Sequence, residues 1–141
     1  MNRALVVVQD SDASRELARR AGTIASATDA ELVVARVLDE AQYQSTLERS
    51  ASGGKTIESI EEAEARAEEI ATEFAADVFG DLDVPYRAIG AVDRLPEAIS
   101  DIAEEEGCDH VFIVGRRRSP TGKAIFGDLA QSTILNFDGM V

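Results

Sequence analysis

The chain has few of the side chains that build disulfide or metal-stabilised frameworks. Its 141 residues include one cysteine, Cys108, one histidine, His110, and no tryptophan. A single cysteine excludes a disulfide framework and a multi-cysteine metal site within this sequence, and a single histidine excludes a site that needs two imidazoles. Cys108, Asp109 and His110 are consecutive, but neighbours along a strand point to opposite faces. We therefore expect that Cys108 and Asp109 do not converge with His110 in a catalytic or metal site.

Long apolar runs are also scarce. The first one, residues 4–8, is too short for the core of a signal peptide or for a membrane span. We therefore expect a soluble, cytoplasmic protein with no membrane partner. A chain of this length is one domain, residues 1–141, and can bury a sufficient core without covalent links.

Lysine is the scarcest charged residue: there are two, against 12 arginines. The 27 acidic and 14 basic side chains give a net charge of −13 and a pI near 4.4. Such a charge repels the phosphates of nucleic acids and anionic lipid surfaces, so neither is expected as a partner. An acidic, lysine-poor chain rich in alanine and valine resembles proteins of salt-accumulating halophiles; an ordinary acidic protein is the alternative.

Two apolar patterns alternate along the chain. Continuous runs rich in β-branched residues indicate strands buried on both faces, at residues 3–9 and 31–38. Two further strands are predicted at 84–90 and 110–115, and Pro85 favours the start of a strand or a sheet edge for the first of these two. Apolar residues at three- and four-residue steps predict helices at 14–28, 59–79 and 96–106, where Pro96 is the first helical residue and Gly107 follows the helix end. A last helix is predicted near 128–136. Residues 39–55 lack a strong period and predict a long loop, or a long loop that contains a helical turn. The alternation predicts an α/β fold, an open parallel sheet with helices on both faces.

The segment from Gly115 to Asp128 is rich in groups that bind anions. It contains glycines, three consecutive arginines at 116–118, Ser119, Thr121 and Lys123, and it leads into a helix N-terminus. Free backbone N–H groups, guanidinium forks, hydroxyls and a helix dipole all favour a phosphate. The segment is not a Walker loop, because Ala124 follows Lys123 and no glycine stands five residues before Gly122. A solvated loop whose arginines balance nearby acidic side chains is the alternative.

Over essentially the whole chain, the sequence resembles the universal stress protein family. The resemblance rests on residues 9–12 after the first strand, 36–39 at the end of the second, the Gly90 region before Pro96, and the loop that begins at Gly115. It implies a Rossmann-like sheet of five parallel strands in the order 3-2-1-4-5, with the fifth strand truncated to Met140 and Val141. Family members commonly dimerise through their fifth strands, so we expect a homodimer whose interface depends on the fourth strand and the last helix, near Phe137.

The resemblance also implies a nucleotide site, which this sequence matches in part. Nucleotide-binding members carry Gly, two residues, Gly, nine residues, then Gly and Ser or Thr. Here Gly115 matches the first glycine and Arg118 replaces the second; with a loop one residue shorter than in the family, Gly127 matches the third glycine and Asp128 replaces the hydroxyl. The family's adenosine-binding aspartate falls on Gln9, or on Asp10 with a shift of one residue, and the adenine-contacting backbone falls on Val37. The predicted nucleotide or phosphate site comprises Asp10, Val37, Gly115, Arg116, Arg118, Ser119, Gly122, Lys123, Gly127 and Asp128.

These patterns favour a small, non-enzymatic universal stress protein. Its predicted ligand is an adenine nucleotide, ATP or AMP, with magnesium accompanying the nucleotide, or another phosphate-bearing small molecule. The alternative is a dimeric interaction module that binds no nucleotide. An ATP-hydrolysing or phosphotransfer enzyme ranks last, because no nucleophile–base pair is visible in the sequence.

Overall fold

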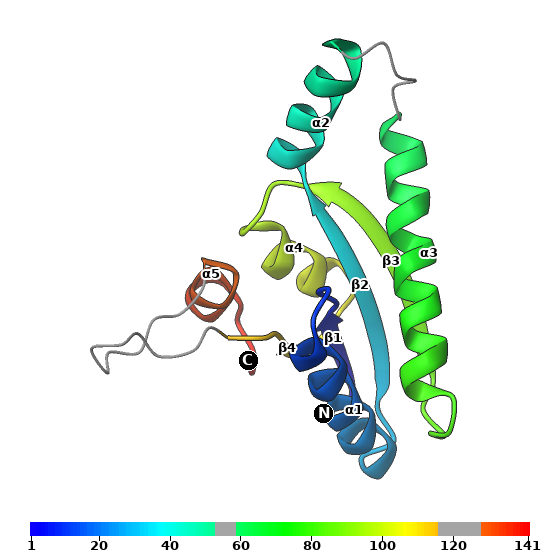
Figure 1. The fold of residues 1–141 in the computed structure, drawn as a ribbon. Helices are drawn as coiled ribbons and strands as arrows, with labels where there is room; N and C mark the ends of the chain where they lie inside the picture. The colour runs from blue at the N-terminus through cyan, green and yellow to red at the C-terminus, as the bar shows by residue number, and fades with distance from the viewer. Residues whose placement is uncertain (53–58, 116–127) are drawn as a thin grey trace, which may run out of the picture.

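The computed structural model describes residues 1–52, 59–115 and 128–141. Strands and helices alternate along these residues (Figure 1). The elements are β1 (Arg3–Val7), α1 (Asp12–Ala27), β2 (Glu31–Asp39), α2 (Glu40–Ser52), α3 (Ile60–Phe79), β3 (Tyr86–Asp93), α4 (Ala98–Glu105), β4 (His110–Phe112) and α5 (Asp128–Asn136).

The four strands form one parallel sheet in the order β3-β2-β1-β4. This confirms the α/β class and the parallel sheet, with the first four strands in the predicted order. No fifth strand forms among the described residues. Instead Met140 makes an isolated parallel bridge to His110, in which Val111 donates to the Met140 carbonyl at 2.8 Å and Met140 donates to the Asp109 carbonyl at 3.1 Å.

Helices cover both faces of the sheet, as predicted (Figure 1). On one face, alternate residues of β1 and β2, such as Val6 and Val34, pack in a core with α1 and α3. On the other face, Leu5 and Val33 pack in a second core with α4 and Phe137, which follows α5. The continuous apolar strands are thus buried on both sides, because each face has its own helices.

Local capping explains where several helices begin and end. Ser11 caps α1 and Ser59 caps α3, each accepting a hydrogen bond from the backbone N–H three residues on, at 3.1 Å. After α4, Gly107 has a φ of +69°, and the N–H groups of Gly107 and Cys108 bond back to the carbonyls of Glu104 and Ala103. This is a Schellman motif, and it confirms Gly107 as the residue after the helix end.

Two local predictions were wrong. Residues 40–52 form helix α2, although a loop was predicted for 39–55. The segment has a weak apolar period, so its sequence pattern did not reveal the helix. Pro96 is not the first residue of α4: it lies in a turn, and α4 begins at Ala98 after Glu97. A proline fits a turn as readily as a first helical turn, so its presence alone did not locate the start of the helix.

Close packing of α3 on β3 depends on one glycine. A Cβ at Gly90 would lie 2.1 Å from the Glu68 amide nitrogen and 2.5 Å from the Glu64 carbonyl oxygen. The helix presents Ala63, Ala67, Ala71 and Ala75 at four-residue steps, all fully buried. Small side chains on both elements therefore let the two backbones approach.

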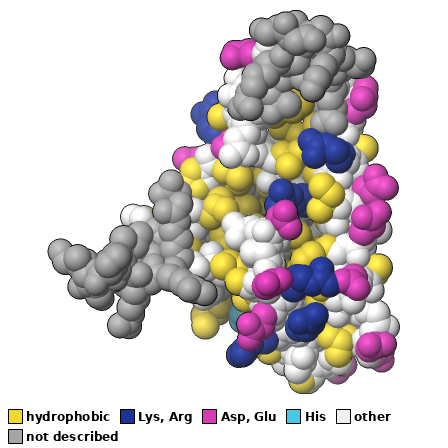
Figure 2. Space-filling model, in the orientation of Figure 1, with side chains coloured by type: hydrophobic (Ala, Val, Ile, Leu, Met, Phe, Trp, Pro, Cys, Tyr) yellow, Lys and Arg dark blue, Asp and Glu magenta, His cyan; other side chains and the backbone are white. Residues whose placement is uncertain are grey.

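The outer side of α3 is acidic. Its glutamates and Asp77 are solvent-exposed, and Figure 2 shows acidic side chains along the edge of the molecule that α3 forms in Figure 1. Glu61, Glu62 and Glu64 therefore lie on a solvated helix face. Among the described residues, no helix is long and apolar enough to cross a membrane.

Candidate functional site

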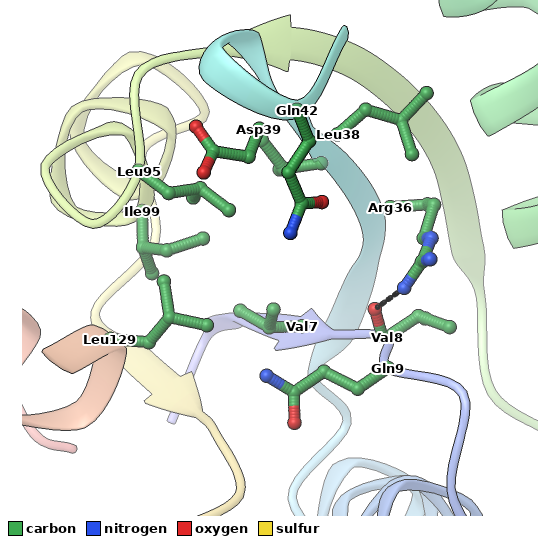
Figure 3. Close-up of a pocket in the computed structure, with 11 residues that line it drawn as sticks. Val7, Val8, Gln9, Arg36, Leu38, Asp39, Gln42, Leu95, Ile99 and Leu129 are labelled. Atoms are coloured by element: carbon green, nitrogen blue, oxygen red, sulfur yellow. Dashed lines mark hydrogen bonds between the residues drawn. The ribbon is translucent and has the colours of Figure 1, made fainter. Parts of the chain in front are cut away.

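A cleft of about 190 Å³ opens beyond the carboxyl ends of β1 and β2 (Figure 3). Ligands of open α/β sheets bind at this edge, where the carboxyl ends of the parallel strands meet. Four segments of the chain contribute to the cleft: the end of β1, the end of β2 with the start of α2, the region from Leu95 into α4, and α5. Its lining residues are Val7, Val8, Gln9, Arg36, Val37, Leu38, Asp39, Gln42, Leu95, Ile99 and Leu129.

The inner wall of the cleft is apolar. Val7 and Val37 belong to the core on the α4 side of the sheet, and Ile99 of that core is fully buried. Leu95 and Leu129 are partly buried and pack against the same core. This wall offers an apolar surface to the apolar body of a ligand.

Polar side chains surround the opening. Figure 3 shows Asp39 on the side of Leu95, Arg36 on the opposite side beside Val8, and Gln42 between them. An Arg36 Nη atom donates to the Val8 carbonyl at 3.2 Å, and an Asp39 carboxylate oxygen accepts from the Ala41 amide at 3.3 Å. The rim thus carries a cation and an anion on opposite sides of the opening.

The turn after β1 is fixed by its own hydroxyl groups. Ser14 is fully buried, and its hydroxyl accepts a hydrogen bond from the Gln9 amide at 2.9 Å. Ser11 caps the same helix. These bonds hold Gln9 where it lines both the cleft and a second hollow.

The second hollow, of about 320 Å³, lies between the start of α1 and α3. It is lined by Gln9, Asp10, Ser11, Asp12, Arg15 and Phe74. Arg15 pairs with Asp77 of α3, and its guanidinium lies 5.6 Å from the centre of the Phe74 ring. The only basic group in this lining is therefore already paired with a carboxylate, and two further acidic side chains lie beside it.

The structure describes three of the ten predicted site residues with their surroundings. Val37 lines the cleft. Asp10 is exposed and lines the second hollow, so it does not share the cleft with Val37. Gly115 is exposed, with open space where a Cβ would stand.

For the other seven predicted site residues, the structure describes no side-chain surroundings. Asp128 is the first residue of α5, as predicted for the helix start, and its side chain lies outside the described part. Arg116, Arg118, Ser119, Gly122, Lys123 and Gly127 lie outside the described residues.

Most of the residues that line the cleft were not predicted as site residues from the sequence. Arg36, Asp39, Gln42, Leu95, Ile99 and Leu129 line it and were not predicted as site residues. Arg36 gave the clearest signal, because it is a charged residue within a strand that is otherwise apolar from Leu32 to Leu38. Leu95, Ile99 and Leu129 had no such signal, since their spacing indicates core positions.

The opposite, amino-terminal edge of the sheet carries an ion-pair network. Arg3 of β1 binds Glu31 of β2 with a 2.7 Å bond from its Nε, and Arg87 of β3 pairs with Glu106. Cys108 lies near both arginines, and burial raises the pKa of its thiol above the ordinary value. A thiol with a raised pKa carries little thiolate near neutral pH, so it is a poor nucleophile.

Asp109 corrects one expectation about this edge. Its carboxylate lies 2.7 Å from His110 Nδ1 and accepts from the Asn2 amide at 2.8 Å. These two side chains do converge, contrary to the prediction, because β4 begins only at His110 and Asp109 precedes the strand. The hydrogen bond with His110, together with that from Asn2, lowers the pKa of the Asp109 carboxyl.

No group of three or more His, Cys, Asp or Glu side chains suited to a metal ion occurs within residues 1–52, 59–115 and 128–141. Asp39 is the one carboxylate that lines the cleft. The described cleft therefore offers a cation a single acidic ligand.

Comparison with protein families defines the class. The universal stress protein family model matches residues 1–141, and the chain belongs to this family. A comparison with curated proteins gives no match.

Solved structures support the fold. The universal stress protein from Archaeoglobus fulgidus is 22% identical over 100% of this chain and 96% of that one, with a TM-score of 0.71. The protein from the same organism in complex with dAMP is 19% identical over 100% and 95%, with a TM-score of 0.65. A universal stress protein in complex with cAMP is 20% identical over 99% and 95%, with a TM-score of 0.59. At these identities the likeness shows a shared fold.

Proposed function

We propose that the cleft beyond β1 and β2 binds an adenine nucleotide, ATP or AMP, or another phosphate-bearing small molecule. The observation that carries the proposal is the cleft itself, an apolar wall with a polar rim at the carboxyl edge of a parallel sheet. Val37, the residue that the family resemblance assigns to adenine contact, lies in that wall. The complexes of two universal stress proteins with dAMP and cAMP support the choice of ligand.

We propose that the protein binds this ligand and does not act on it as an enzyme. The described cleft contains one carboxylate, one guanidinium and two amides, without a cysteine, serine or histidine to serve as nucleophile or base. Magnesium would enter with the phosphates of a bound nucleotide. We place the protein in the cytoplasm on the sequence grounds given above.

The test is a cleft-filling variant measured with a matched control on the same helix. Leu129 lines the cleft, whereas Leu135 of α5 is 73% exposed and does not. In molar potassium chloride, we expect calorimetry to detect ATP, AMP or cAMP binding to the wild type and to Leu135→Trp. Leu129→Trp should bind at least about ten-fold more weakly, because an indole would occupy the ligand's space. Equal affinity in both variants would place the ligand elsewhere.

A second candidate function, homodimerisation as an interaction module, is favoured by exposed apolar side chains near the C-terminal end of the chain. Ile134, Leu135, Met140 and Val141 are each at least half exposed and lie at or after the end of α5. Phe137 itself is buried, so the predicted interface would use these neighbours instead. Light scattering over a salt and concentration series should report a dimer that tightens at high salt, since screening reduces repulsion between acidic protomers. A mass of about 15 kDa at high salt and concentration would exclude it.

A further inference from the structure

Arg36 differs from the paired arginines described above, because no carboxylate among the described residues pairs with it. Arg3, Arg15 and Arg87 each form an ion pair with an acidic residue. Arg36 is half-buried within β2, and its one hydrogen bond among the described residues is the 3.2 Å bond to the neutral Val8 carbonyl. In a chain of net charge −13, acidic partners are abundant. The missing carboxylate is therefore a property of this position.

The guanidinium also has an unsatisfied donor. Arg36 Nε is buried and has no hydrogen-bond partner within the described part of the chain. A buried donor without an acceptor destabilises the folded state, and a permanently charged guanidinium gains most from an anionic oxygen. The fold keeps this group where it lines the cleft, beside the end of β1.

The position of Asp39, the one acidic side chain in the cleft lining, indicates on which side of the opening an anion would bind. Figure 3 shows Asp39 turned toward Leu95, on the other side of the opening from Arg36, and no ion pair joins the two. An anionic group would be repelled on the Asp39 side and attracted on the Arg36 side. The cleft is thus polarised across its opening.

We propose that Arg36 binds an anionic oxygen of the cleft's ligand and so selects phosphorylated over unphosphorylated nucleosides. This inference rests on the proposed function and deepens it, because it assigns phosphate recognition to a residue of β2. Arg36 Nε is the donor that lacks an acceptor within the described part of the chain, and an oxygen of the ligand would supply that acceptor while an Nη atom keeps its bond to the Val8 carbonyl. Planar guanidinium forks match phosphate oxygens better than an ammonium does.

The test compares AMP with adenosine, which lacks the phosphate, in wild type, Arg36→Gln and Arg36→Lys. Arg19→Gln is the control, since it removes the same charge from an exposed position on α1. Arg36→Gln should weaken AMP binding about ten-fold or more and adenosine binding less than two-fold. Arg36→Lys should lose less than Arg36→Gln, because the charge remains. Arg19→Gln should bind both ligands as the wild type does.

Failure of this inference differs from failure of the proposed function. If the wild type binds AMP and Arg36→Gln binds it equally well, Arg36 does not hold the anion, while the cleft remains a nucleotide site. Equal losses for AMP and adenosine would make Arg36 a structural residue and overturn the inference. If Arg36→Gln does not fold, Arg36→Lys decides by the same comparison, with a loss for AMP alone in support and no loss, or equal losses, against.

In the remaining case, the wild type binds neither nucleoside nor nucleotide, and the proposed function fails. A direct measurement on the Arg36 side chain then tests whether it binds an anion. The Arg36 Nε–H resonance, assigned by its absence in Arg36→Lys, is followed during titration with inorganic phosphate at constant ionic strength. A saturable shift supports an anion site at Arg36. An unmoved resonance overturns it.

Discussion

Gly90→Ala tests the packing of α3 on the sheet, which closes one side of the fold that carries the cleft. The added Cβ would stand 2.1 Å from Glu68 N and 2.5 Å from Glu64 O, and both atoms are helix backbone. Reaching an ordinary contact of 3.4 Å requires a relative shift of 1.3 Å at the closest point. No side-chain rotation can supply that shift. The helix must move as a body and loosen its buried alanines from β3.

The expected loss of stability is at the upper end of the overpacking range. Overpacking a core commonly destabilises by about 1–3 kcal/mol, and we expect about 3 kcal/mol here because the obstacle is backbone. For a chain of this size that corresponds to a fall in Tm of about 10 °C. Thermal melts by circular dichroism provide the measurement, with Gly115→Ala as control because its Cβ would meet nothing within 4 Å. A Gly90→Ala protein that melts within 2 °C of the wild type would refute the described packing.

Two further predictions concern charge. Raising potassium chloride from 0.1 M to 2 M should raise the Tm, because the Debye length falls from about 10 Å toward 3 Å or below and the net charge of −13 repels itself less; a flat or falling Tm would remove the halophile interpretation. Hydrogen bonds from His110 and Asn2 lower the pKa of the Asp109 carboxyl. The stability that this carboxylate contributes is therefore present above its unfolded pKa near 3.8 and is lost as the pH falls through the lower folded value. Urea melts from pH 6 to pH 2.5 should therefore show wild type and Asp109→Asn differing most above pH 4 and converging below it, and a constant difference over this range would contradict the assignment.

Elements with strong local signals could be predicted from the sequence. The first helix, predicted at 14–28, and the first two strands follow from apolar periods and runs that each segment carries itself. The start of α3 follows from Ser59, whose hydroxyl caps the helix as the sequence indicates. The weakly periodic α2 was missed. The segments with strong local patterns have their structure determined by their own residues, whereas α2 is a helix without a clear sequence signature.

The candidate site was less predictable because it is assembled from distant segments. The family resemblance assigned both Val37 and Asp10 to the nucleotide site. The structure places Val37 in the cleft and Asp10 in the neighbouring hollow. Leu95 and Leu129 reach the cleft only through the packing of α4 and α5 on β1. Their sequence positions carry the ordinary pattern of a core. The polar rim depends on which way each side chain leaves its strand end, and a one-residue shift after β1 moves a side chain from the cleft to the other hollow.

Chemical-shift mapping with AMP tests the central claim most directly. Backbone amide spectra of the uniformly ¹⁵N-labelled protein are recorded in molar potassium chloride as AMP is added to saturation. We expect the largest shifts at the carboxyl edge of the sheet, at Gln9, Val37 and Asp39, while Asn2 and Glu31 at the amino-terminal edge stay unchanged. Saturable shifts concentrated at Asn2 and Glu31, or no shifts at any AMP concentration, would contradict it.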